Sequence, residues 1–211
     1  MQELPKFITL EGGDGAGKST QIQMLKSYFE KQKIPCLFTK EPGGSVGADE
    51  IRQILINGQL NKWDAVSETL LFYASRRAHL VDTIWPALKA GKWVISDRFA
   101  DSTLAYQVYG RQSKLITKEQ VADLYHLVAG DFKPDLTIIL DIDPQVGLNR
   151  VSQRGQADRF EASALAFHER LREGFKEIAA AEPERCVVIN ADNPPEMLHR
   201  EIVRLIEDRF S

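Results

Sequence analysis

The sequence predicts an α/β fold in which a five-stranded parallel sheet is covered by helices on both faces. Short apolar runs alternate along the chain with longer segments whose apolar residues recur at helical spacing. The short runs are continuously apolar, which is typical of strands that are buried on both faces and joined by crossover helices. The expected strands are residues 7–10, 36–39, 93–96, 136–141 and 186–190.

The segments between and after these strands have the periodicity of amphipathic helices. One apolar stripe, for example, contains Phe167, Leu171 and Phe175. Because no internal repeat and no Gly-, Ser- or Pro-rich linker divides the chain, we expect residues 1–211 to form one domain. The expected helices are residues 19–31, 47–57, 66–90, 118–129, 145–151, 161–180 and 196–209.

The composition argues against several classes of partner. The net charge is −3 and the sequence pI is about 5.9, so no global positive field favours nucleic acid or an anionic membrane surface. The N-terminus lacks the apolar core of a signal peptide, and no apolar segment is long enough to span a bilayer. We therefore expect a cytoplasmic protein. Cys36 and Cys186 both lead into apolar runs and are interpreted as buried hydrophobic residues, not as a disulfide or a metal pair.

Residues 12–19 read Gly-Gly-Asp-Gly-Ala-Gly-Lys-Ser, which fits the phosphate-loop pattern, and they stand between an expected strand and an expected helix. Backbone N–H groups of such a loop, with the N-terminus of the following helix, can surround a polyphosphate. We expect a nucleoside triphosphate here, with Lys18 at the outer phosphates and Ser19 on Mg²⁺. The fold is then that of the P-loop NTPases. The residues expected to bind the triphosphate are Gly12, Gly13, Asp14, Gly15, Ala16, Gly17, Lys18, Ser19 and Thr20.

A GTPase is the first class to consider, because Asn61-Lys62-Trp63-Asp64 spells the guanine-reading pattern. That pattern should follow a buried strand late in the sheet. Here it leads into a long helix that Asp64 or Ser67 can cap, and the chain lacks the Asp-x-x-Gly switch outside the phosphate loop. We interpret the match as a coincidence.

Ligands of parallel sheets collect at the carboxyl ends of the strands. Residues 41–44, 97–98 and 141–143 occupy such positions. Asp97 can orient Mg²⁺ through its water shell, and Arg98 can hold a second phosphate with both guanidinium branches. Taken alone, the two residues can equally be a structural ion pair.

The stretch from Asp97 to Gln107 closely resembles the signature of thymidylate kinases, the enzymes that phosphorylate dTMP with ATP. The resemblance implies the nucleoside monophosphate kinase type of P-loop fold and the conversion of dTMP to dTDP with ATP and Mg²⁺, in the synthesis of dTTP. It extends from Phe7 to the C-terminal helix. The matching blocks are the phosphate loop, residues 41–45, the helix with Phe72 and Arg76, residues 97–107 and residues 150–161.

The resemblance also implies roles at the acceptor nucleotide. The residue corresponding to Phe72 stacks on thymine, and those corresponding to Arg76 and Gln107 read the edge of the base. Tyr106 resembles the ring that lies under the deoxyribose, where a ribose hydroxyl would clash. An acid at the position of Asp14 is associated with the 3′-hydroxyl; bacterial relatives often carry glutamate, so a direct contact and a bridging water both stay open. The expected acceptor residues are Asp14, Glu41, Pro42, Phe72, Arg76, Arg98, Ser102, Thr103, Tyr106 and Gln107.

The phosphate loop has no arginine at its variable positions, so the chain resembles family members that supply one from a lid over ATP. The lid is expected at residues 150–161, which carry Arg150, Arg154 and Arg159. A solvated basic helix end is the alternative interpretation. We expect Lys18, Asp97, Arg98 and Arg154 to be the catalytic residues, with Ser19 and Asp97 as the metal site.

Two other functions stay open at this point. Another nucleoside or nucleotide kinase of the same fold would differ in its acceptor, and a nucleotide-dependent switch would bind a triphosphate without transferring phosphate. The resemblance favours a small-molecule kinase that acts as a homodimer. The apolar faces of helices 47–57 and 66–90 are the candidates for the dimer interface.

Overall fold

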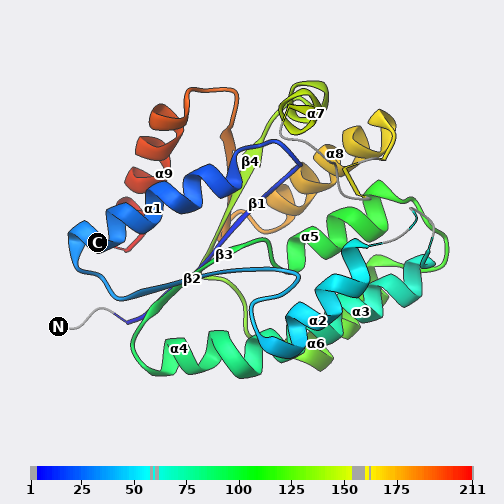
Figure 1. Cartoon of the computed structure of the whole chain (residues 1–211), viewed down its shortest axis with the longest axis horizontal. Coiled ribbons are helices and arrows are strands. Elements are labelled where there is room, and N and C mark those ends of the chain that lie inside the picture. The colour runs from blue at the N-terminus through cyan, green and yellow to red at the C-terminus, as the bar shows by residue number, and fades with distance from the viewer. Residues whose placement is uncertain (1–3, 58, 60–61, 154–159, 162, 211) are drawn as a thin grey trace.

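The computed structural model describes residues 4–57, 59, 62–153, 160–161 and 163–210. Five parallel strands form one sheet in the order β2-β3-β1-β4-β5 (Figure 1). This confirms the predicted α/β class. The strands are β1 (Phe7–Gly12), β2 (Cys36–Lys40), β3 (Trp93–Asp97), β4 (Leu136–Asp141) and β5 (Cys186–Asn190).

Helices cover both faces of the sheet. On one face, α1 and α9 lie side by side and bury Leu25 and Ile202 against strand residues such as Leu10. The other face is covered by a group of helices that includes α3, α5, α6 and α8, and α2 packs on α3. The α-helices are α1 (Lys18–Gln32), α2 (Val46–Ile56), α3 (Ala65–His79), α4 (Trp85–Lys89), α5 (Ala100–Leu104), α6 (Lys118–Ala129), α7 (Pro144–Ser152), α8 (Leu165–Ala181) and α9 (Pro195–Phe210).

Two predicted helices need correction, and one helical segment was not predicted. The segment predicted as one helix over 66–90 contains a π-helical stretch, Leu80–Ile84, between α3 and α4. The helix predicted from residue 161 begins at Leu165, after the extended Ala164. The sequence also gave no sign of α5 and the π-helical Ala105–Gly110 that continues it. Asp, Ser and Thr near the start of that helix have low helix propensity, so packing against α8 decides its conformation.

Glycine makes this packing possible. A Cβ on Gly110 would collide with the ring of Phe167 on α8, and a Cβ on Gly174 would collide with Tyr109. The π-helical segment and α8 therefore approach more closely than larger residues allow. This contact fixes the helix that carries Tyr106 and Gln107.

Both cysteines are free thiols and lie on opposite edge strands, Cys36 half-buried on β2 and Cys186 buried on β5. Burial raises the pKa of each thiol to about 12, which suits the predicted hydrophobic role. Among the described residues, no helix has the length and apolar character needed to cross a membrane.

Candidate active site

The phosphate loop connects β1 to α1 and is held against neighbouring backbone. Gly12 and Gly15 have φ angles of +126° and +76°, and a Cβ on either would collide with the backbone of Leu140 or Gly147. Gly17 is the N-cap of α1 and adds no side chain there. The first backbone N–H groups of α1 are thus left to an anion.

Lys18 lies inside this loop. Its Nζ donates hydrogen bonds of 2.9 Å to both Gly12 O and Gly13 O. Burial, together with the nearby charge of Arg98, lowers the pKa of Lys18 to about 8. The ammonium group is therefore poorly compensated by the protein alone, and phosphate oxygens in the loop would supply the missing negative charge.

Ser19 and Asp97 come together at the end of the loop, as predicted. Ser19 Oγ lies 3.3 Å from Asp97 Oδ2. Hydroxyl and carboxylate oxygens are ligands that Mg²⁺ accepts, usually together with water and substrate phosphates. With only two such oxygens, the position of Ser19 and Asp97 suits a metal that phosphate also binds. No cluster of three or more metal-ligating His, Cys, Asp or Glu occurs in the part of the chain that the structure describes.

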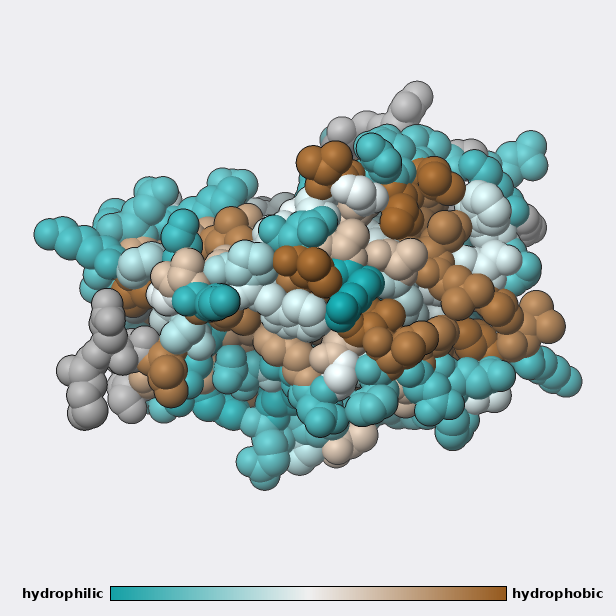
Figure 2. All heavy atoms as spheres, turned by 90° about the horizontal axis from the view of Figure 1, so that it is seen from below, coloured by the Kyte–Doolittle hydropathy of each residue, from teal (hydrophilic) through white to brown (hydrophobic). Residues whose placement is uncertain are grey.

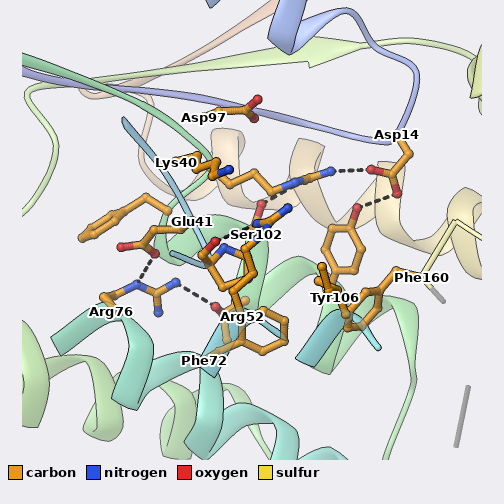
Figure 3. Close-up of a pocket in the computed structure, with 15 residues that line it drawn as sticks. Asp14, Lys40, Glu41, Arg52, Phe72, Arg76, Asp97, Ser102, Tyr106 and Phe160 are labelled. Carbon is orange, nitrogen blue, oxygen red and sulfur yellow. Dashed lines mark hydrogen bonds and ion pairs between the residues drawn. The ribbon is translucent and has the colours of Figure 1, made fainter. Parts of the chain in front are cut away.

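A second pocket opens beside the loop at the carboxyl ends of β1, β2 and β3 (Figure 3). Its wall includes most of the predicted acceptor residues. Sequence reasoning missed other wall residues, among them Lys40, Arg52 and Phe160. Lys40 precedes Glu41 and Phe160 falls in the expected lid, so proximity was a signal for these two, whereas Arg52 had none. The predicted residues that line the pocket are Asp14, Glu41, Pro42, Phe72, Arg76, Asp97, Arg98, Ser102, Thr103 and Tyr106.

Asp14 and Tyr106, both labelled in Figure 3, form one hydrogen-bonded group with Arg98. Arg98 Nη2 lies 2.5 Å from Asp14 Oδ1, and the Tyr106 hydroxyl donates to Asp14 Oδ2 at 2.9 Å. The Arg98 guanidinium also lies over the Tyr106 ring, 5.1 Å from its centroid. Although burial alone would raise it, the pKa of Asp14 is lowered, because the charges of Arg98 and Lys18 outweigh that effect. The sequence predicted these three residues for the acceptor but not their contact.

Arg76 is fixed by a different group at the lower end of the pocket. Its Nε donates to Glu41 Oε2 at 2.9 Å and its Nη2 donates to Thr103 Oγ1 at 2.9 Å. The guanidinium lies near the rings of Tyr73 and Phe99 and is 2% exposed. Its third nitrogen, Nη1, is buried and has no hydrogen-bond partner among the described residues. This leaves one donor of a positioned guanidinium for a ligand.

Glu41 is held from behind by His79. His79 Nδ1 lies 3.0 Å from Glu41 Oε1, and its Nε2 lies 2.7 Å from Thr39 Oγ1. The Glu41-Pro42 peptide bond is cis, and Arg52 Nη1 donates to Pro42 O at 2.7 Å. The prediction that Glu41 contacts the substrate stays a prediction; the structure shows that its carboxylate also orients Arg76.

Aromatic rings form the apolar side of the pocket. The Phe160 ring lies 6.0 Å from that of Phe72 and 5.8 Å from that of Tyr106, between centroids. Phe72 stands four residues before Arg76 on α3, and both face the pocket, which agrees with the predicted shared helix face. A planar, partly apolar ligand fits between such rings.

A buried carboxyl group supports the site from below. Glu11 accepts hydrogen bonds from Phe99 N at 2.7 Å and from Ser102 Oγ at 2.5 Å. Burial, reinforced by Asp101, raises the pKa of Glu11 to about 8. Sequence reasoning missed Glu11, because a carboxyl next to a phosphate loop gives no sign of being buried.

Some predictions lie elsewhere or outside the described residues. Gln107 is fully buried but does not line the pocket, so a direct contact with the ligand needs an adjustment there. Arg154 and Arg159 lie outside the described residues. Arg150 donates to Asp192 Oδ1 at 3.2 Å, in the loop after β5.

The GTPase-like motif ends in a helix cap. Asp64 caps α3 by accepting a hydrogen bond from Ser67 N at 2.8 Å, which confirms the capping interpretation of this motif.

Comparisons with known proteins agree with this geometry. A thymidylate kinase from Magnetococcus marinus is 46% identical over 206 residues, 97% of each chain. One from Caulobacter vibrioides is 50% identical over 186 residues, 88% of each chain. The crystal structure of a thymidylate kinase from Ehrlichia chaffeensis superposes with a TM-score of 0.77 at 35% identity, covering 96% of this chain and 98% of its own. The family model described as thymidylate kinase matches residues 10–202. The chain therefore belongs to the thymidylate kinase family.

Proposed function

We propose that the protein transfers the terminal phosphate of ATP to dTMP in one in-line step, with Mg²⁺ and without a phosphoenzyme. The observation that carries this proposal is the position of Arg98. Its Nη1 donates to Gly12 O of the phosphate loop at 3.0 Å and to Ser102 Oγ of the acceptor pocket at 3.1 Å. One guanidinium thus borders both sites, and direct transfer requires that donor and acceptor phosphates be adjacent.

On the donor side, the backbone of residues 12–17 and the side chains of Lys18, Ser19 and Thr20 bind ATP. Lys18 keeps its place in the loop and exchanges carbonyl partners for phosphate oxygens. Ser19 and Asp97 hold Mg²⁺, directly or through water. Bound Mg²⁺ neutralises charge on the transferred group.

On the acceptor side, Phe72 stacks on thymine and Arg76 Nη1 donates to a carbonyl of the base. Arg98 and Ser102 hold the phosphate of dTMP, and the group of Asp14 and Tyr106 meets the sugar. When the phosphate binds, Arg98 is already charged and oriented, because Asp14 and Gly12 O hold it. Preorganisation of this kind lowers the barrier without a covalent step.

The lid arginine remains a proposal from the sequence. Arg154 is proposed to stabilise charge on the transferred phosphoryl group, a role in which an arginine raises the rate by about 10³ to 10⁵.

We further propose one domain, a cytoplasmic location and a homodimer. The dimer interface is proposed on the apolar surface of α2 and α3, where Ile54, Val66 and Leu70 are exposed.

A coupled assay of ADP production tests the reaction. The acceptors dTMP, dUMP, dCMP, dGMP and thymidine are supplied in turn with ATP and Mg²⁺. We expect dTMP to be preferred and dUMP to be used less well, since one missing methyl group costs about 1–3 kcal/mol. Lys18→Ala should abolish the activity, whereas Lys31→Ala, at an exposed position of the same helix, serves as the matched control. Wild-type protein that makes no dTDP contradicts the proposal, and preference for another acceptor reassigns the substrate.

A further inference from the structure

A buried carboxylate lies directly behind Gln107. Glu68 on α3 is fully buried, and its Oε1 accepts a hydrogen bond of 2.6 Å from Gln107 Nε2. The same oxygen lies 3.0 Å from Arg111 Nη2. Arg111 gives the counter-charge that an ionised carboxylate needs at this depth. The proposed reaction assigns no role to Glu68.

The chemistry of this contact fixes which way the Gln107 amide faces. An ionised carboxylate only accepts hydrogen bonds, whereas an amide has a donor NH₂ and an acceptor oxygen. The amide must therefore turn its NH₂ group to Glu68, and Oε1 faces the other way. This oxygen is buried and has no hydrogen-bond partner among the described residues. Because buried acceptors are normally hydrogen-bonded, we expect a bound ligand to supply the donor.

The two helices place this amide near the base end of the acceptor pocket. Gln107 follows Thr103 by four residues on the helix formed by α5 and its π-helical continuation, and Thr103 Oγ1 is the partner of Arg76 Nη2. On α3, Glu68 stands four residues before Phe72 and eight before Arg76, on the same face. Arg76 Nη1 and Gln107 Oε1 are thus one donor and one acceptor, both buried and both without a hydrogen-bond partner among the described residues.

That pair matches one class of pyrimidine. Thymine and uracil present an N3–H donor next to the C4 carbonyl acceptor, which complements an acceptor and a donor on the protein. Cytosine presents an N3 acceptor next to an amino donor, which is the reverse pattern. A site that leaves a buried polar group unpaired with the wrong ligand discriminates strongly against it.

We propose that Glu68 is a specificity-determining positioning residue. It fixes the amide of Gln107 with the oxygen toward the base, and so selects oxo-pyrimidine over amino-pyrimidine monophosphates. The inference rests on the proposed dTMP kinase function and extends it. Replacing Glu68 by glutamine would free the Gln107 amide to turn, because a glutamine side chain can offer either an acceptor or a donor.

The test measures kcat/KM for dTMP and for dCMP with the variants E68Q and E68D and the wild type. We expect the dTMP to dCMP ratio to fall at least about tenfold in E68Q, because the turned amide can donate to N3 of cytosine and no longer accepts from N3–H of thymine. E68D keeps an acceptor-only group and should keep the ratio within about threefold even where overall activity drops. KM for ATP and the thermal midpoint are measured as well. A change in the ratio without a change in these two quantities indicates an effect on base recognition, not a general structural one.

Gln107→Met gives a second arm that leaves Glu68 and Arg111 in place. Methionine has a similar length and offers neither donor nor acceptor, so the ratio should fall here as well. A ratio within about twofold of wild type in folded E68Q, or in Q107M if E68Q does not fold, overturns the inference. If the wild type makes no dTDP, both the proposed function and this inference fail. If the wild type makes dTDP but the variants keep the ratio, only this inference fails.

Discussion

The guanidinium of Arg98 and the carboxylate of Asp14 are joined at 2.5 Å, between Nη2 and Oδ1, across the boundary of the two pockets. Both side chains are largely buried, and Arg98 has a φ angle of +70°, which is rare for a residue with a side chain. The surrounding structure therefore holds Arg98 in an unfavourable backbone conformation, which is typical of residues whose position is needed at a functional site. The pair holds the arginine beside the phosphate loop before any phosphate arrives.

Arg98→Lys tests whether this geometry is needed. Lysine keeps the charge but cannot contact Gly12 O, Ser102 Oγ and Asp14 with one planar fork. We expect kcat/KM for dTMP to fall by about 100-fold or more, with KM for ATP changed much less. Steady-state kinetics with each substrate varied in turn measures this. Equal losses for both substrates would contradict the assignment of Arg98 to the acceptor.

Tyr106 is predicted to exclude ribonucleotides. Its hydroxyl is fixed by Asp14, so the ring cannot move aside for a 2′-hydroxyl group. Tyr106→Ala should raise the use of the ribose form, TMP, relative to dTMP. Tyr106→Phe keeps the ring and should preserve most of the discrimination. The ratio of kcat/KM for the two nucleotides is the measurement, and an unchanged ratio in the alanine variant refutes the role.

His79 is predicted to act on the base site through Glu41. The amide of asparagine can take the place of His79 Nδ1 and keep the contact with Glu41. The longer glutamine places its amide near the position of Nε2, so it keeps the contact with Thr39 and loses the contact with Glu41. We expect KM for dTMP to rise about tenfold in His79→Gln and about threefold or less in His79→Asn. Gly44 packs on the His79–Thr39 contact, so both variants should lower the thermal midpoint to a similar extent. Equal KM values in the two variants would assign His79 a purely structural role.

Glu11 should make stability depend on pH. Its pKa in the folded protein is about 8, above the ordinary value of 4.5, so the folded state binds a proton that the unfolded state has lost between these pH values. The free energy of unfolding contributed by Glu11 is therefore fully present below pH 4.5 and decreases as pH rises toward about 8, by at most about 1.4 kcal/mol per pH unit.

Glu11→Gln keeps the shape of the side chain and removes this titration. The difference in unfolding free energy, variant minus wild type, should grow with pH across that window in urea denaturation series. Glu30→Gln, at an exposed position on α1, is the control and should give a flat difference. Parallel curves for Glu11→Gln and the wild type would show that Glu11 is ionised in the folded protein.

The proposed dimer can be tested at Leu70, which is 50% exposed on α3. Figure 2 shows apolar side chains gathered on the face seen from below, on the side where α3 and α6 lie in Figure 1. Leu70→Glu should shift the mass in light scattering from dimer to monomer, because a buried unpaired charge is costly at an interface. Met197→Glu, on α9 across the sheet, is the control and should leave the mass unchanged. A wild-type monomer at micromolar concentration contradicts the dimer.

The sequence by itself determined the sheet and the phosphate loop, because both depend on local rules. Apolar runs of strand length and amphipathic periodicity set the elements, and Gly12, Gly15 and Gly17 have φ angles that other residues avoid. The carboxyl ends of the strands gave the right places for Glu41, Asp97 and Arg98, because parallel strands bring those ends to one edge. Resemblance to a family added the roles of side chains.

Only the tertiary structure decided how those side chains contact one another. The pairs Glu41–Arg76 and Glu68–Gln107 join residues that are 35 and 39 positions apart, so their contact depends on how helices and strands pack. The π-helical Ala105–Gly110 and α5 escaped prediction for the same reason, since the approach of α8 overrides weak local propensity. The burial of Glu11, which changes its protonation, likewise comes from the surrounding fold and has no signature in the residues next to it.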